Sequence, residues 1–95
     1  MMAIQLQQIP AFRRGYRLQW EPTQDCHVIL YPEGMAKLNE TAALILQQVD
    51  GKASVAAIIS DLNQQFPGAG GVDDDVVEFF AQAAEQKWII YRDPA

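Results

Sequence analysis

The chain has one cysteine and one histidine, and these are neighbours, Cys26 and His27. A thiolate–imidazole pair would need both side chains on the same side of the backbone, within hydrogen-bonding distance. The run from Cys26 to Tyr31 is rich in β-branched and aromatic residues and predicts a strand, in which adjacent side chains point to opposite faces. We therefore expect a thiol packed inward and an exposed imidazole, not a catalytic pair.

A second group of reactive side chains is the acidic run of Asp73, Asp74 and Asp75. This run lacks the spaced ligands of a calcium loop, and carboxylates stabilise the first turn of a helix, so we interpret it as a helix start. The chain also has no phosphate-binding loop, dinucleotide fingerprint or nucleophile elbow. The sequence thus predicts a protein that is not an enzyme and that holds no metal or cofactor.

The segment after this acidic run has apolar residues at helical spacing and predicts a helix to about residue 86. The apolar stripe is wider than one core-facing side requires. It consists of Val76, Phe79, Phe80, Ala83 and Ala84, widened by Val77, Ala81 and Trp88. Two interpretations stay open: a wide core stripe in a small protein, or a helix that packs inward on one side and lines a groove on the other.

The short apolar run from Met35 to Leu38 follows a Pro-Glu-Gly turn and predicts a third strand at a sheet edge. A peptide can add to such an edge as a further strand, through main-chain hydrogen bonds. Small residues such as Ala81 and Ala84 would let that peptide approach the helix. The alternative is an edge protected by Lys37 and by its own shortness.

The elements that would position these residues follow from local patterns. The sequence predicts an α+β domain like a winged helix-turn-helix, with a three-stranded antiparallel sheet followed by three helices. Residues 1–12 are expected to be a flexible arm and residues 13–92 a single domain. The predicted strands are 17–21, 26–31 and 35–38. The predicted helices are 40–49 with Asn39 as cap, 54–66 with Ser54 as cap, and 73–86 with Asp73 as cap, before an extended tail at 88–91.

The charge distribution limits the possible partners. The formal net charge is -5, and all of the excess lies in residues 50–95, so nucleic acid and anionic membranes are poor partners. Arg13 and Arg14 are either a solvated patch or a docking site for an acidic partner surface. One cysteine, no run of about 20 apolar residues and no signal-peptide pattern favour the cytoplasm.

The ordered set of motifs resembles the family of pyrroloquinoline quinone biosynthesis protein D, PqqD, over about residues 10–92. The matching residues are Arg13-Arg14-Gly15-Tyr16, Trp20, Leu30-Tyr31-Pro32-Glu33-Gly34, Leu38-Asn39, Ala42, Ile45, Asp50-Gly51, Asp75-Val76, Phe79 and Trp88. The resemblance implies a carrier that binds the ribosomal precursor peptide PqqA and presents it to the radical S-adenosylmethionine enzyme PqqE. It also implies that the carrier holds no quinone.

In this family the leader peptide pairs with the third strand and lies against the third helix of a winged-helix-like fold. The resemblance therefore implies peptide contacts at Met35, Ala36, Lys37, Leu38, Val77, Phe80, Ala81 and Ala84. One residue and one loop depart from the family pattern. Lys87 replaces a helix-stopping glycine, so the third helix is expected to end differently or to run on. The loop 67–71 is unusually rich in glycine and could permit exchange of the third helix between two chains. The protein is therefore expected to be either a monomer or a homodimer formed by this exchange.

Two other functions compete with the peptide carrier. A winged-helix transcription regulator would need a basic recognition helix, whereas the third helix here is acidic. A winged-helix module for protein–protein interaction remains an alternative. An enzyme of the same pathway would need a cluster of titratable groups, and the sequence offers none.

Overall fold

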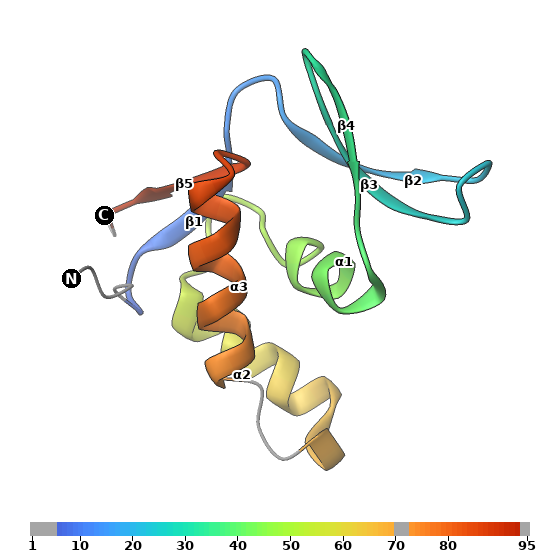
Figure 1. Ribbon diagram of the computed structural model, residues 1–95. Helices are drawn as coiled ribbons and strands as arrows, with labels where there is room; N and C mark the ends of the chain where they lie inside the picture. Colours follow the sequence, from blue (N-terminus) through green and yellow to red (C-terminus); the bar gives the residue numbers. More distant parts are fainter. Residues whose placement is uncertain (1–5, 70–72, 94–95) are drawn as a thin grey trace.

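The chain folds into two small antiparallel sheets and three α-helices in the part of the chain that the computed structural model describes, residues 6–69 and 73–93 (Figure 1). The strands are β1 (Ile9–Phe12), β2 (Arg17–Glu21), β3 (Cys26–Tyr31), β4 (Gly34–Lys37) and β5 (Ile89–Arg92). The helices are α1 (Glu40–Leu46), α2 (Val55–Gln65) and α3 (Asp73–Glu85), with a short 3-10 helix, η1 (Pro67–Ala69), before α3. The α+β class is as predicted, while the winged-helix likeness stays a prediction.

The larger sheet has the strand order β2-β3-β4, as the sequence predicted for the two hairpins. In its register, Leu18 lies opposite Ile29, and Ile29 lies opposite Ala36. Because side chains alternate along a strand, these three residues share one face, and Ile29 is fully buried. Within the described residues β4 has a neighbour on one side only, so the prediction of an edge strand is confirmed.

The smaller sheet corrects the expectation of a flexible arm over residues 1–12. Ile9–Phe12 form β1, which pairs with β5 in the register Ile9↔Arg92 to Phe12↔Ile89. The chain before β1 is also tied down, because the N–H groups of Val55 and Ala56 donate to the carbonyls of Gln8 and Leu6, both at 2.9 Å. These two amides belong to the first turn of α2, where no intrahelical acceptor exists. The part of the expected arm at residues 1–5 lies outside the described residues.

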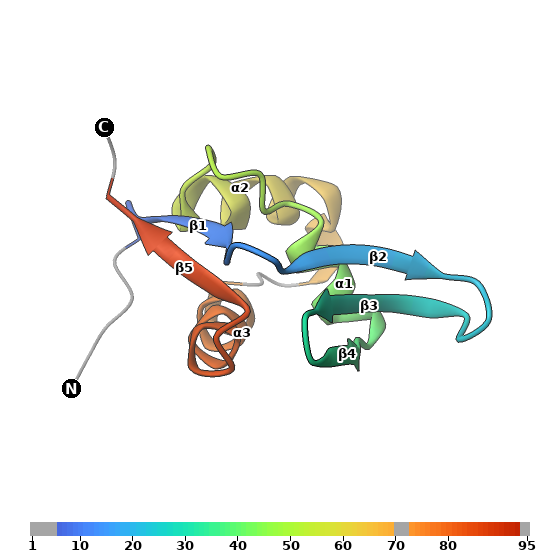
Figure 2. The same ribbon diagram turned by 90° about the horizontal axis from the view of Figure 1, so that it is seen from above.

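The hydrophobic core lies between the three helices and the inner face of the larger sheet. Each helix contributes one buried stripe, and β5 closes the core through Ile89. Figure 2 shows β4 and α3 on the same side of the molecule, with β5 continuing from the end of α3. The largest fully buried side chains include Phe80, Ile29, Leu46, Ile58, Val28, Val55 and Val76.

Two helix starts follow the predicted capping chemistry. The Asn39 side chain accepts a hydrogen bond from the N–H of Ala42 at 2.8 Å, and Ser54 accepts one from Ala57 at 3.1 Å. The first helix ends at Leu46, earlier than predicted, and a turn carries the chain on to Asp50. Asp73, expected as the third cap, is instead the first residue of α3.

At the end of α3, a lysine occupies the helix-closing position that is usually a glycine. Lys87 has a φ of +66°, in the left-handed region that glycine normally occupies. The N–H of Trp88 donates to the carbonyl of Ala83, and the N–H of Lys87 donates to that of Ala84, both at 3.0 Å. This pair of bonds is the Schellman arrangement that closes a helix. The helix therefore stops at Glu85, and the departure at Lys87 does not make it run on.

Candidate functional site

A groove of about 620 Å³ lies between the edge strand β4 and helix α3. The two elements lie on the same side of the molecule in Figure 2. Asn39 and Ala42, at the start of α1, also line the groove. Its lining combines an edge strand with a helix surface, which is the geometry that accepts an extended peptide. The lining residues are Ala36, Lys37, Leu38, Asn39, Ala42, Phe79, Gln82, Ala83, Glu85, Gln86 and Trp88.

The main-chain groups of β4 determine which hydrogen bonds an added strand would make at this groove. The N–H of Leu38 donates to the carbonyl of His27 at 3.0 Å, which marks Leu38 as a position hydrogen-bonded to β3. In an antiparallel ladder such positions alternate with positions whose N–H and C=O point away from the partner strand. By this alternation the amide and carbonyl groups of Met35 and Lys37 point to the open edge. An added strand would therefore bond to these two residues.

The groove is apolar at its base and polar at its rim. Leu38, Ala42 and Ala83 are buried at the base, and the two alanines leave room for an incoming side chain. The half-buried aromatic rings of Phe79 and Trp88 line the groove above them. The exposed polar side chains of the lining are Lys37, Asn39, Gln82, Glu85 and Gln86. Such a site can hold one large apolar side chain of a bound segment while its main chain pairs with β4.

Arg13 holds the end of the groove in place. Its N–H donates to the carbonyl of Trp88 at 3.1 Å, and its Nη1 donates to that of Lys87 at 3.3 Å. The guanidinium also lies 5.4 Å from the centre of the Tyr16 ring, and Tyr16 stacks on Tyr31 with ring centres 5.4 Å apart. Arg13 is half-buried and stabilises the chain at the end of α3, whereas its neighbour Arg14 is exposed.

The structure brings together the predicted contacts on the strand but not those on the helix. Ala36, Lys37 and Leu38 line the groove, and Met35 is 42% exposed beside it. On α3, Phe80 is fully buried in the core. Val77 and Ala84 are half-buried and do not belong to the groove lining. Ala81 is exposed but lies outside the lining.

The difference on α3 is a rotation about the helix axis. The predicted residues 77, 80 and 81 and the observed lining residues 79, 82 and 83 have the same spacing, displaced by two residues, and Glu85 also lines the groove from α3. Two residues correspond to about 200° of helix rotation. The residues that the sequence analysis missed are Asn39, Ala42, Phe79, Gln82, Ala83, Glu85, Gln86 and Trp88. Phe79 and Ala83 belong to the apolar stripe noted above, so that stripe was a usable signal.

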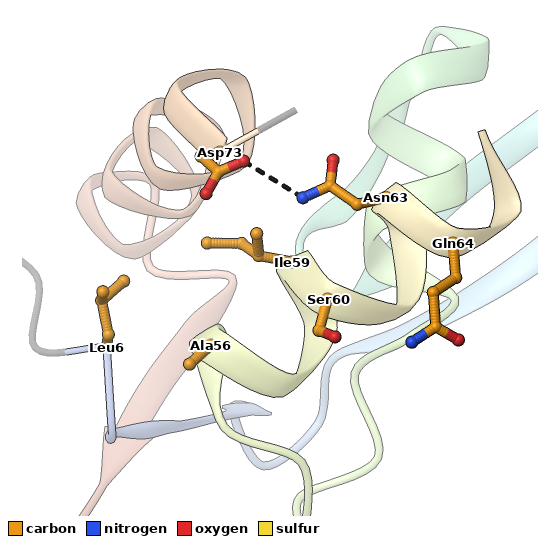
Figure 3. A pocket seen from close by; sticks show the side chains of 7 residues that line it. All are labelled: Leu6, Ala56, Ile59, Ser60, Asn63, Gln64 and Asp73. Carbon is orange, nitrogen blue, oxygen red and sulfur yellow. Dashed lines mark hydrogen bonds between the residues drawn. The ribbon is translucent and has the colours of Figure 1, made fainter. Parts of the chain in front are cut away.

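A second, shallower pocket of about 450 Å³ lies between Leu6, α2 and the start of α3 (Figure 3). Apolar Leu6, Ala56 and Ile59 meet polar side chains there, and Asn63 donates to Asp73 at 3.1 Å. This pocket offers no open strand edge. Across residues 6–69 and 73–93, no three His, Cys, Asp or Glu side chains gather as a metal site would require.

Two titratable groups outside the groove have shifted pKa values. The N–H groups of Ala53 and Lys52 donate to Asp50 Oδ1 at 2.9 and 2.8 Å and hold the pKa of this carboxyl below its usual value. Burial raises the pKa of the Tyr91 phenol. None of the described helices is both long enough and apolar enough to span a bilayer.

The fold and the groove define a small α+β domain with an open strand edge beside a helix, the arrangement of a peptide-recognition domain. Residues 26–89 match the family described as coenzyme PQQ synthesis protein D, PqqD. The chain belongs to this family, as its sequence motifs indicated.

Relatives and a solved structure agree with this assignment. A PqqA binding protein of Rahnella aquatilis is 64% identical over the full length of both chains. Another, of Klebsiella pneumoniae strain 342, is 72% identical over 90% of this chain and 94% of the relative. The solution structure of the PqqD truncation of Methylobacterium extorquens PqqCD superimposes with a TM-score of 0.71 at 28% identity, covering 86% of this chain and 88% of that one. That protein is described as a functional, stand-alone recognition element for ribosomally synthesised, post-translationally modified peptides.

Proposed function

We propose that this protein is a non-catalytic carrier that binds the precursor peptide PqqA during synthesis of pyrroloquinoline quinone. The observation that carries the proposal is the open edge of β4 beside the groove against α3. Relatives with 64% and 72% identity have the name PqqA binding protein, which supports the choice of peptide.

The bound peptide forms a fourth strand on the larger sheet. Its main chain pairs with Met35 and Lys37, and one apolar side chain lies above Ala42 and Ala83, between Phe79 and Trp88. Ala36 and Leu38 contribute from the strand side. This arrangement retains the expected contacts on β4 and replaces those on α3 by the side of the helix that lines the groove.

The carrier then presents the peptide to the radical S-adenosylmethionine enzyme PqqE. Arg14 is exposed and is a candidate contact for an acidic surface of that enzyme, while Arg13 is engaged in holding the end of α3. The carrier acts as a monomer or as a homodimer formed by element exchange, which sedimentation of the purified protein distinguishes.

Calorimetric titration with synthetic PqqA peptide, with and without PqqE, tests this function. We expect saturable binding of one peptide per chain and chemical-shift changes in the amides of β4 and in Gln82 and Gln86. Absence of binding under both conditions would remove PqqA as the ligand. A change in the mass of the peptide after incubation with this protein alone would contradict the non-catalytic role.

A further inference from the structure

The two walls of the peptide groove belong to different parts of the fold. The strand wall, β4, is part of the larger sheet, whereas the helix wall runs from α3 to Trp88 and leads directly into β5 of the smaller sheet. Contacts that join the two parts therefore help to determine the distance between the walls. Figure 2 shows one such connection, the segment that leads from β1 in the smaller sheet to β2 in the larger one.

The first half of this connection is fixed to the helix wall. Arg13 follows β1, and its main-chain N–H and its Nη1 donate to the carbonyls of Trp88 and Lys87. Trp88 also lines the groove. One half-buried arginine thus makes two hydrogen bonds to the end of the helix wall.

The second half of the connection reaches the strand wall through stacked rings. The Arg13 guanidinium lies 5.4 Å from the centre of the Tyr16 ring, close enough for a cation–π interaction. Tyr16 stacks on Tyr31 with ring centres 5.4 Å apart and planes inclined by 15°. Tyr31 pairs with Gly34, the first residue of β4. A continuous series of contacts therefore runs from Trp88 to β4, and we call its three side chains the Arg13–Tyr16–Tyr31 bridge.

The backbone between Arg13 and Tyr16 is a tight turn that keeps the bridge short. The N–H of Tyr16 donates to the carbonyl of Arg13 at 2.9 Å. Gly15 has a φ of +88°, a backbone conformation that residues with a side chain rarely adopt. A Cβ atom on Gly15 would lie 3.6 Å from Cγ of Pro32. The turn therefore packs against Pro32, the residue that follows Tyr31.

We propose that Arg13, Tyr16 and Tyr31 are positioning residues for peptide binding and hold the two walls of the groove at the spacing that a bound strand requires. None of the three lines the groove, so they act on the peptide through Trp88 and β4. A groove held in this way loses little freedom when the peptide binds, and this preorganisation increases affinity. The inference rests on the proposed function for the identity of the peptide.

The test compares PqqA affinity with stability in variants that break the bridge. Arg13→Met keeps an aliphatic side chain and removes the charge and the side-chain donors. Tyr16→Ala removes the ring between the other two side chains, and Tyr16→Phe keeps that ring. Val49→Ala removes packing from the same core, outside the groove and the bridge, and is the control for a loss of stability alone. Calorimetry is carried out under conditions in which urea denaturation shows each variant to be fully folded.

We expect Arg13→Met and Tyr16→Ala each to weaken PqqA binding about threefold to tenfold. The double variant should bind no more weakly than Tyr16→Ala alone, because either change breaks the same series of contacts. Tyr16→Phe should recover most of the affinity that Tyr16→Ala loses. Val49→Ala should lower stability and leave PqqA affinity unchanged.

A second readout needs no peptide. The indole N–H resonance of Trp88 in the free protein should shift or broaden in Arg13→Met and Tyr16→Ala and stay in place in Val49→Ala. Trp20 lies near the far end of β2 from Tyr16, and its indole resonance is the internal reference.

Three results would overturn the inference. If Arg13→Met and Tyr16→Ala lost stability but bound PqqA with wild-type affinity, the bridge would be purely structural. Additive losses in the double variant would show that Arg13 and Tyr16 act separately. An unchanged Trp88 resonance in both variants would show that the bridge does not position the helix wall. Failure of the wild type to bind PqqA would instead refute the proposed function, while the Trp88 resonance would still test the bridge.

Discussion

At the scale of single residues, the proposed binding mode depends more on the main chain of β4 than on its side chains. Met35 and Lys37 direct their amide and carbonyl groups to the open edge, whereas the groups of Leu38 are used by β3. Side-chain changes at 35 or 37 should therefore have less effect on peptide affinity than removal of the N–H itself.

Replacing Lys37 with proline removes one edge-facing N–H and leaves the bonds to β3 intact. Proline is tolerated on an edge strand where the missing N–H faces outward. We expect Lys37→Pro to lower PqqA affinity about fivefold to tenfold, which corresponds to one net hydrogen bond of about 1 kcal/mol. Lys37→Ala keeps the N–H and is the matched control in calorimetry. Equal losses in both variants would assign the effect to the lysine side chain.

Lys87 offers a stability test at the same scale. A non-glycine residue in the left-handed region costs about 1–2 kcal/mol. We expect Lys87→Gly to raise the free energy of unfolding by about 1 kcal/mol in urea denaturation, with PqqA affinity unchanged because Lys87 does not line the groove. Gln86→Gly lies one residue earlier, where the backbone is not left-handed, and should give no gain. A destabilised Lys87→Gly would show that the lysine side chain contributes more than its backbone strain removes.

At the scale of elements, α3 shows what a sequence pattern can and cannot predict. Its existence and its acidic first turn follow from local spacing, and so do α1, α2 and the hairpins β2-β3 and β3-β4. The side of α3 that faces β4 does not follow, because Phe79 and Phe80 are adjacent apolar residues on different sides of the helix. Which of them enters the core is decided by packing against residues far away in the sequence.

A bulky residue at two neighbouring exposed positions of α3 separates the predicted side from the observed one. Gln82 lines the groove and Ala81 does not. We expect Gln82→Trp to block the groove and to weaken PqqA binding at least about tenfold, and Ala81→Trp to bind normally, because adjacent helix positions point about 100° apart. Fluorescence anisotropy with labelled peptide measures both. If Ala81→Trp weakened PqqA binding more than Gln82→Trp did, the peptide would contact the side of α3 that the family resemblance implied.

The loop between α1 and α2 depends on the ionised state of Asp50. The N–H groups of Ala53 and Lys52 donate to the Asp50 carboxylate and lower its pKa from 3.8. The stability that this ionised group contributes is therefore complete above the pKa of the unfolded state. It is lost as the pH falls through the lower pKa of the folded state. We expect Asp50→Ala to be less stable than the wild type at pH 7 and the difference to vanish at strongly acidic pH. Asp50→Asn keeps an acceptor oxygen without the charge and is the matched control. If Asp50→Ala were less stable than the wild type by the same amount at every pH, the ionisation of Asp50 would not contribute to stability.

At the scale of the whole molecule, the pairing of β1 with β5 joins segments almost a full chain length apart. Local propensity could not reveal this, because Ile9–Phe12 is short, contains Pro10, and becomes a strand only beside Ile89–Arg92. The same distance explains why the segment at the amino end was expected to be a flexible arm. The edge strand β4, by contrast, is predictable because its partner is the adjacent hairpin strand.

Deletion of residues 1–12 tests the structural role of this segment. It removes the partner of β5, buried Pro10 and Ala11, and the acceptors of the Val55 and Ala56 amides. We expect a loss of about 3 kcal/mol or more in the free energy of unfolding. We also expect fast hydrogen exchange at those two amides. Unaltered stability would contradict the role of β1 and restore the expectation of a flexible arm.

The pairing of β1 with β5 also determines where other domains can be fused to this protein. Because Ile9 lies opposite Arg92, the polypeptide enters and leaves the fold at neighbouring points, away from β4 (Figure 1). A domain fused at either end would start from the same side of the molecule and leave the edge of β4 accessible. A short linker across the two ends, with new termini opened in the loop between β2 and β3, should give a circular permutant that retains the groove.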